Sequence, residues 1–134
     1  VKEGSGSVQQ ASDLVQMCGD RLTVLAGDDA LTLPMMAVGG KGVITVTANI
    51  VPAEMARLVA AFTEGKIEEA RRIHFKLSPL FAALFFETNP IPVKEALSLM
   101  GKIDPELRLP LCPMAQDTRE KLVQVLKDAS LITR

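Results

Sequence analysis

The sequence predicts an α/β protein in which short parallel strands alternate with helices, followed by a second half made of helices. Two apolar runs with β-branched residues, 22–25 and 42–46, are separated and followed by segments with helical apolar spacing. This alternation indicates parallel strands joined by crossover helices. Even with the chain start counted as the end of a further strand, three strands are too few for a well-covered sheet. The pattern is therefore typical of the last part of a larger α/β protein.

The composition excludes several classes of protein. The chain has 134 residues, of which 48% are apolar and 23% charged, so it is long enough for one ordinary domain and too apolar for a disordered chain. A formal net charge of −1 leaves no basic surface for nucleic acid. No apolar run is long enough to span a bilayer, and no signal peptide is visible. Cys18 and Cys112 lie in unrelated contexts, which favours a reducing, cytoplasmic location.

The helices are predicted from apolar stripes and from residues that favour helix ends. Ser7 should cap the first helix by accepting a hydrogen bond from the backbone N–H of Gln10, and Gly19 should end that helix. Asp28 is a good N-cap, and Pro52 suits a first helical position. The predicted helices cover residues 8–18, 28–38, 52–64, 67–84, 93–100 and 117–129.

Two segments between the later helices are predicted to be irregular. The run Asn89-Pro90-Ile91-Pro92 should be a fixed extended turn, because a residue that precedes proline is disfavoured in the helical region. Residues 102–113 contain three prolines, Pro105, Pro110 and Pro113, and should form an ordered connection.

Lys2 is the first candidate for chemistry. A lysine at the carboxyl end of a barrel strand would lie at the face where the active sites of barrels are found, and its free amine can attack a carbonyl to form a Schiff base. The alternative is a surface lysine near a frayed terminus. Gly27 follows a strand directly and suits a turn that approaches a ligand closely. Asp28 and Asp29 are interpreted as a helix cap and an acidic first turn.

The remaining candidates are weaker. Ile44 and Thr45 end the second apolar run, where a β-branched residue is more often part of the core than of a site. His74 lies in the apolar stripe of a helix, with no second His or Cys at ligand spacing, and is interpreted as structural. The sequence shows no set of metal ligands, no phosphate loop and no nucleotide fingerprint, so no metal is expected.

Several motifs together resemble the C-terminal half of the dihydrodipicolinate synthase family, over essentially the whole chain. They are Lys2-Glu3 with Ser5-Gly6-Ser7, residues 25–30 (Leu-Ala-Gly-Asp-Asp-Ala), residues 39–49 (from Gly-Gly-Lys-Gly to Thr-Ala-Asn), residues 87–94 (from Glu-Thr-Asn-Pro to Val-Lys) and residues 107–111 (Leu-Arg-Leu-Pro-Leu). The blocks at 39–49 and 87–94 are specific. The Lys-Glu pair is shared with other Schiff-base aldolases.

The resemblance implies a fold and a reaction. The fold is the C-terminal part of a (β/α)8 barrel, about three strands with their helices over residues 1–64, continuous with a C-terminal helical extension over residues 65–134. The reaction is the condensation of pyruvate with L-aspartate semialdehyde to 4-hydroxy-tetrahydrodipicolinate, in lysine and diaminopimelate biosynthesis. It implies no metal and no organic cofactor, and it implies a cytoplasmic homotetramer.

The resemblance also implies roles for three residues. Lys2 matches the Schiff-base lysine, which forms a covalent imine with pyruvate. Gly27 and Ile44 match residues that line the pyruvate pocket. Ala26 and Thr45 stand where many members have serine, which is a mild departure. The family's relay tyrosines belong to the first half of the barrel, and this chain has no tyrosine. The isolated chain is therefore expected to be inactive without that half.

Two alternatives stay open at this point. One is another pyruvate-dependent Schiff-base aldolase, such as N-acetylneuraminate lyase, against which the blocks at 39–49 and 87–94 argue. The other is a non-catalytic barrel fragment that persists by self-association, because its strand edge and its apolar helix stripes would be uncovered.

Overall fold

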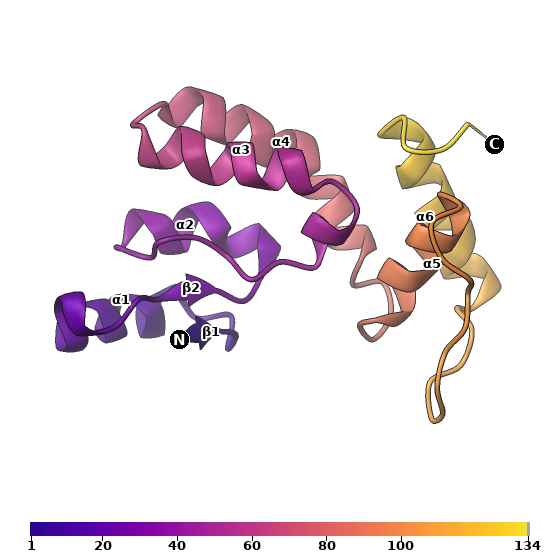
Figure 1. The fold of residues 1–134 in the computed structure, drawn as a ribbon, viewed down its shortest axis with the longest axis horizontal. Coiled ribbons are helices and arrows are strands. Elements are labelled where there is room, and N and C mark those ends of the chain that lie inside the picture. The colour runs from indigo at the N-terminus through magenta and orange to yellow at the C-terminus, as the bar shows by residue number, and fades with distance from the viewer. Residues whose placement is uncertain (134) are drawn as a thin grey trace. The chain divides into compact units, whose positions relative to one another are not determined.

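The computed structural model describes residues 1–133 and divides the chain into two compact units. The first unit is Val1–Lys76 and the second begins at Leu77, so the boundary falls within helix α4 (Ile67–Ala83) (Figure 1). None of the described helices combines the length and the apolar character that crossing a membrane requires.

The first unit contains a small parallel sheet. Strands β1 (Lys2–Glu3) and β2 (Leu25–Ala26) pair in parallel, with Lys2 opposite Leu25 and Glu3 opposite Ala26. A third segment lies along the other side of β2, where Val43 forms a parallel bridge with Ala26. The parallel arrangement predicted from the alternation of strands and helices is confirmed.

The prediction of a full strand over residues 42–46 is wrong. Pairing there is limited to the bonds Ala26 N–H to Gly42 O and Ile44 N–H to Ala26 O, both 2.8 Å, preceded by Lys41 N–H to Val24 O at 2.9 Å. Val46 is already in the helical region and leads into a 3₁₀ turn over Thr47–Asn49. A β-branched run favours extended backbone, but the length of a strand also depends on the length of the neighbouring strand. Here that strand, β2, covers Leu25–Ala26 only.

The predicted strand over residues 22–25 is displaced in the same way. A 3₁₀ turn over Gly19–Arg21 delays the extended segment, and β2 itself covers Leu25–Ala26. Buried residues of β2 and of the position before it, of α1 (Val8–Cys18) and of α2 (Thr32–Ala37) meet in one apolar cluster, which contains Ala11, Val24, Ala26 and Met35. Helix α2 contacts both α1 and α3 (Pro52–Thr63), and this order is visible in Figure 1.

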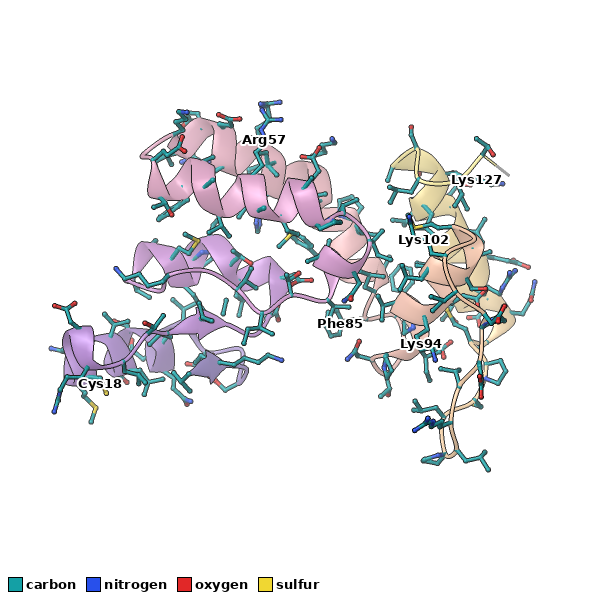
Figure 2. The ribbon with its side chains drawn as sticks, in the orientation of Figure 1. Cys18, Arg57, Phe85, Lys94, Lys102 and Lys127 are labelled. Atoms are coloured by element: carbon teal, nitrogen blue, oxygen red, sulfur yellow. The ribbon has the colours of Figure 1, made fainter. Side chains whose placement is uncertain are left out.

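The predicted caps of α1 are confirmed. The Ser7 hydroxyl accepts a hydrogen bond from Gln10 N–H at 3.1 Å, and Gly19 ends the helix with a φ of 53°. The reciprocal half of a capping box is absent, because Ser7 N–H donates to the Ser5 hydroxyl at 3.2 Å, while the Gln10 side-chain amide donates to the Glu3 carboxylate at 3.2 Å. Cys18 lies at the last position of α1 (Figure 2). The capping interactions therefore tie α1 to the end of β1.

Helices α3 and α4 are joined on their outer side by charged side chains. Arg57 donates to Glu69 Oε1 from Nε at 2.9 Å and from its terminal nitrogen at 2.5 Å. Figure 2 shows Arg57 on the side of this helix pair that faces away from α2. The Arg57 hydrogen bond lowers the pKa of the Glu69 carboxyl. Arg57 is exposed and Glu69 is half-buried, so solvent screens the pair and it adds little to stability.

The second unit contains α5 (Ile91–Leu99) and α6 (Gln116–Asp128), packed against each other. Arg119 Nε donates to Glu95 Oε1 at 2.7 Å across the two helices. The predicted extended turn at residues 89–92 is wrong in its second half, because Ile91 and Pro92 open α5. A proline in the first turn of a helix loses no intrahelical bond, so the helix tolerates it there.

The predicted connection over residues 102–113 is confirmed as free of helix and strand. Lys94, which is labelled in Figure 2, donates a hydrogen bond from Nζ to the Glu106 carbonyl and so holds this connection to α5. At the other end, Glu87 Oε1 accepts hydrogen bonds from Ala115 N–H, just before α6, at 2.9 Å and from the Thr118 hydroxyl, within α6.

Candidate functional site

The carboxyl ends of the three parallel segments meet at one edge of the sheet. Gly27 N–H donates to Glu3 O at 2.6 Å, and Ile44 N–H donates to Ala26 O at 2.8 Å. These bonds place the residues that end β1, β2 and the third segment in adjacent rows. In parallel α/β sheets, ligands bind at this end of the strands. The edge formed by Lys2, Gly27 and Ile44 is therefore the candidate site.

Lys2 and Gly27 are brought into direct contact. A Cβ added at residue 27 would lie 2.9 Å from Lys2 Cε, 2.7 Å from Glu3 O and 2.9 Å from Gly4 Cα. No side chain fits there without movement of the backbone. The absence of a side chain at Gly27 thus lets the aliphatic part of Lys2 cross the end of β2. The amine itself belongs to an exposed side chain.

Ile44 lies one row further from Lys2, beyond β2. Its backbone N–H is engaged with Ala26, and its side chain is 48% exposed. An exposed isoleucine at a strand end is not part of the core of this unit, contrary to the commoner role of a β-branched residue. Thr45, the next residue, accepts a hydrogen bond from Ala48 N–H at 3.1 Å and so begins the turn that follows.

Two buried carboxylates lie beside these strand ends. Glu3 is 3% exposed, and its Oε1 accepts from Ser5 N–H at 2.9 Å. Asp29 is 2% exposed, and its Oδ2 accepts from Thr47 N–H at 2.8 Å. Within the part of the chain that the structure describes, Glu3 Oε2, Asp29 Oδ1 and the Thr47 hydroxyl are buried without a hydrogen-bond partner.

Asp29 lies in the first turn of a 3₁₀ helix over Asp29–Leu31, so the predicted acidic first turn is confirmed, but its burial and its bond to Thr47 were not predicted. Asp28 does have the predicted capping role, since its side chain accepts from Ala30 N–H at 2.9 Å. One signal in the sequence distinguishes Asp28 from Asp29. Where two adjacent aspartates stand at a helix start, only one can be the N-cap, so the other needs a different role. For Glu3, the signal is the alternation of side chains along a strand. Because Lys2 is exposed on one face, the next residue, Glu3, points to the other face.

The other chemically capable residues stay apart from this edge. His74 is half-buried in α4, and burial lowers the pKa of its imidazole below the ordinary value. Its ring packs edge-on against Phe75, with centroids 5.6 Å apart. Among residues 1–133, no three His, Cys, Asp or Glu side chains gather in a way that could hold a metal ion.

Comparisons with known proteins agree with the motifs in the sequence. The model of the dihydrodipicolinate synthetase family matches residues 1–129. The 4-hydroxy-tetrahydrodipicolinate synthase of Thermodesulfovibrio yellowstonii is 56% identical over 132 residues, which are 98% of this chain and 45% of that protein. The enzyme of the same name from Geotalea uraniireducens is 54% identical and is covered to 46%.

Solved structures give the same result for the fold. Dihydrodipicolinate synthase from Aquifex aeolicus superposes with a TM-score of 0.96 at 46% identity, over 99% of this chain and 45% of that one. The enzyme from Thermotoga maritima superposes with a TM-score of 0.92 at 43% identity, over 98% and 45%. The chain thus spans about half the length of the relatives and structures that it matches.

Proposed function

Because this chain belongs to the dihydrodipicolinate synthetase family, we propose that it carries the Schiff-base lysine of a lyase that condenses pyruvate with L-aspartate semialdehyde. The product is 4-hydroxy-tetrahydrodipicolinate, an intermediate of lysine and diaminopimelate biosynthesis. The observation that carries the proposal is the contact of Lys2 with Gly27 at the carboxyl edge of a parallel sheet. The names of the two relatives above favour this reaction over that of N-acetylneuraminate lyase.

In the proposed mechanism, the uncharged Lys2 amine attacks the ketone carbon of pyruvate. Loss of water from the resulting carbinolamine gives an iminium ion, which withdraws electrons from the adjacent methyl group. Loss of a methyl proton then gives an enamine, whose carbon attacks the aldehyde of the second substrate. The α-amino group of the second substrate then attacks the imine carbon, which closes the ring and displaces the Lys2 amine, so that the cyclic product is released and Lys2 is regenerated. The electron sink is the iminium ion, so the proposal includes no metal and no organic cofactor.

The proposal gives the neighbouring residues binding roles. Gly27, which follows the end of β2, and the backbone of Ile44, on the neighbouring third segment, line the pyruvate pocket. Residues 1–64 supply the last strands and helices of a (β/α)8 barrel, and residues 65–134 form a C-terminal helical extension. Proton relay requires residues from the other half of the barrel, because this chain has no tyrosine. The complete protein is proposed to act as a cytoplasmic homotetramer.

The proposal is tested by trapping the imine. The complete product of the gene that encodes this chain is incubated with pyruvate, reduced with borohydride, and digested for peptide mass spectrometry. We expect the adduct on Lys2 and its loss in Lys2→Arg, because a guanidinium does not form the imine. The matched control is Lys41→Arg, which changes an exposed lysine of the same unit and should retain the adduct. An adduct spread over exposed lysines, or absent from Lys2, contradicts the proposal.

A further inference from the structure

Asp29 makes a buried hydrogen bond between two loops that are far apart in the sequence. Its Oδ2 accepts from the backbone N–H of Thr47 at 2.8 Å, across 18 residues of chain. The carboxylate is 2% exposed, and Thr47 is fully buried. Its position is fixed locally as well, because the Thr32 hydroxyl donates to Asp29 O at 2.8 Å. This bond is thus shielded from competition with water.

The two loops are the ones that carry the predicted pyruvate-binding residues. Asp29 lies two residues beyond Gly27, and Thr47 lies three residues beyond Ile44. The other side-chain caps in this region act within one loop: Asp28 on Ala30, at 2.9 Å, and Thr45 on Ala48, at 3.1 Å. The Asp29–Thr47 bond therefore continues the connection between the two strand ends past the last ladder bond, from Ile44 N–H to Ala26 O.

The remaining polar atoms of this pair argue against a purely structural contact. Asp29 Oδ1 and the Thr47 hydroxyl are both buried without a hydrogen-bond partner among the described residues. A buried carboxylate with an unsatisfied oxygen is costly, and a well-packed apolar pair would be a more stable connection. Such a costly contact is understandable where it fixes the geometry of a binding site.

We propose that Asp29 is a positioning residue that fixes the Gly27 turn against the Ile44 turn and thereby sets the shape of the pyruvate pocket. The inference rests on the proposed function, because it assumes that these turns bind pyruvate. It assigns Asp29 no contact with the substrate and no part in proton transfer. The effect should therefore appear in the binding of pyruvate rather than in the chemical step.

The test separates binding from chemistry in the complete gene product. Asp29→Ala removes the acceptor for Thr47 N–H, and we expect it to raise the KM for pyruvate by roughly tenfold. The kcat, calculated per active site that is trapped on Lys2 by pyruvate and borohydride, should change much less. Asp29→Asn keeps a carbonyl oxygen in place and should restore a KM near that of the unmodified protein. Asp28→Ala is the matched control, because it removes an acidic cap that acts within one loop only.

A structural measurement accompanies the kinetics and begins with the unmodified protein. Hydrogen exchange followed by NMR or mass spectrometry should show a protected Thr47 amide in the unmodified protein. Protection should be retained in Asp29→Asn. A Thr47 amide that exchanges at the rate of an open loop overturns the proposal. Loss of trapped sites in Asp29→Ala, with KM unchanged in the remaining sites, also overturns it, because that is the result of a fold defect alone.

The outcomes distinguish the two proposals. If the unmodified protein is not trapped on Lys2, the proposed function and the positioning role both fail. If Lys2 is trapped and Asp29→Ala leaves the KM for pyruvate unchanged, only the positioning role fails.

Discussion

Single residues at the strand ends decide how closely the three rows approach. Glycine at position 27 has a steric basis, since both neighbouring backbone and Lys2 Cε lie within 3 Å of the place that a Cβ would take. The sequence predicts that the turn at Gly27 could approach a ligand, but the atoms that fill this space belong to Lys2, Glu3 and Gly4. Such a contact depends on strand register, which no local pattern contains.

Gly27→Ala should therefore disturb both stability and the site. Crowding by backbone atoms cannot be relieved by a rotamer change, so we expect a loss of about 1–3 kcal/mol in the free energy of unfolding and a weaker pyruvate adduct on Lys2. Denaturant unfolding and the trapping assay measure the two effects. Gly4→Ala is the control, because nothing lies within 4 Å of its added Cβ. Equal behaviour of the two variants would show that the close approach at Gly27 is unimportant.

Among the elements, α1 shows how local sequence signals and long-range contacts combine. Ser7 and Gly19 were assigned as its ends from the sequence, and both assignments are confirmed. The sequence does not show that the side-chain amide of Gln10 donates to the Glu3 carboxylate while its backbone N–H completes the cap. That choice reflects the position of β1, which buries Glu3 beside the start of the helix. Helix ends follow local rules, whereas a partner on another element requires the tertiary structure.

The cap itself gives a prediction for α1. Ser7→Ala leaves Gln10 N–H without its side-chain acceptor and should lower the free energy of unfolding by about 1 kcal/mol. Ser12→Ala, inside the same helix, is the matched control and should change stability by less than about 0.5 kcal/mol. The midpoint of urea unfolding of the complete gene product, followed by circular dichroism, measures both. A control that loses as much stability as Ser7→Ala would mean that the cap bond contributes nothing specific.

At the scale of the whole molecule, the first unit has an open apolar groove. The groove has a volume of 680 Å³ and runs between the third segment and α3, with Val43, Met55 and Val59 among its lining residues. Among the described residues, β1 pairs with β2 along one side only. An uncovered strand edge beside apolar surface favours association. The relatives, of which this chain covers about half, have further chain to bury such surface.

We predict that the 134-residue chain, produced by itself, forms concentration-dependent oligomers or a loosely packed state. Sedimentation velocity over a range of concentrations measures the association, and thermal unfolding measures the cooperativity. Val59→Glu, which places a charge in the groove, should shift the distribution toward the monomer. A monomer at every concentration with a sharp cooperative melt contradicts the prediction.

The sequence by itself determined most of the helices, many of their ends to within two residues, the parallel order of the strands and the membership of the family. These depend on spacing and composition within a few residues, or on motifs that survive as blocks. The helix predicted over residues 28–38 is instead a 3₁₀ helix over Asp29–Leu31 followed by α2. Tertiary structure decided the length of the strands, the contact between Lys2 and Gly27, and the buried bond from Asp29 to Thr47. The physical reason is that these contacts join residues many positions apart, so they are set by the register and packing of separate elements.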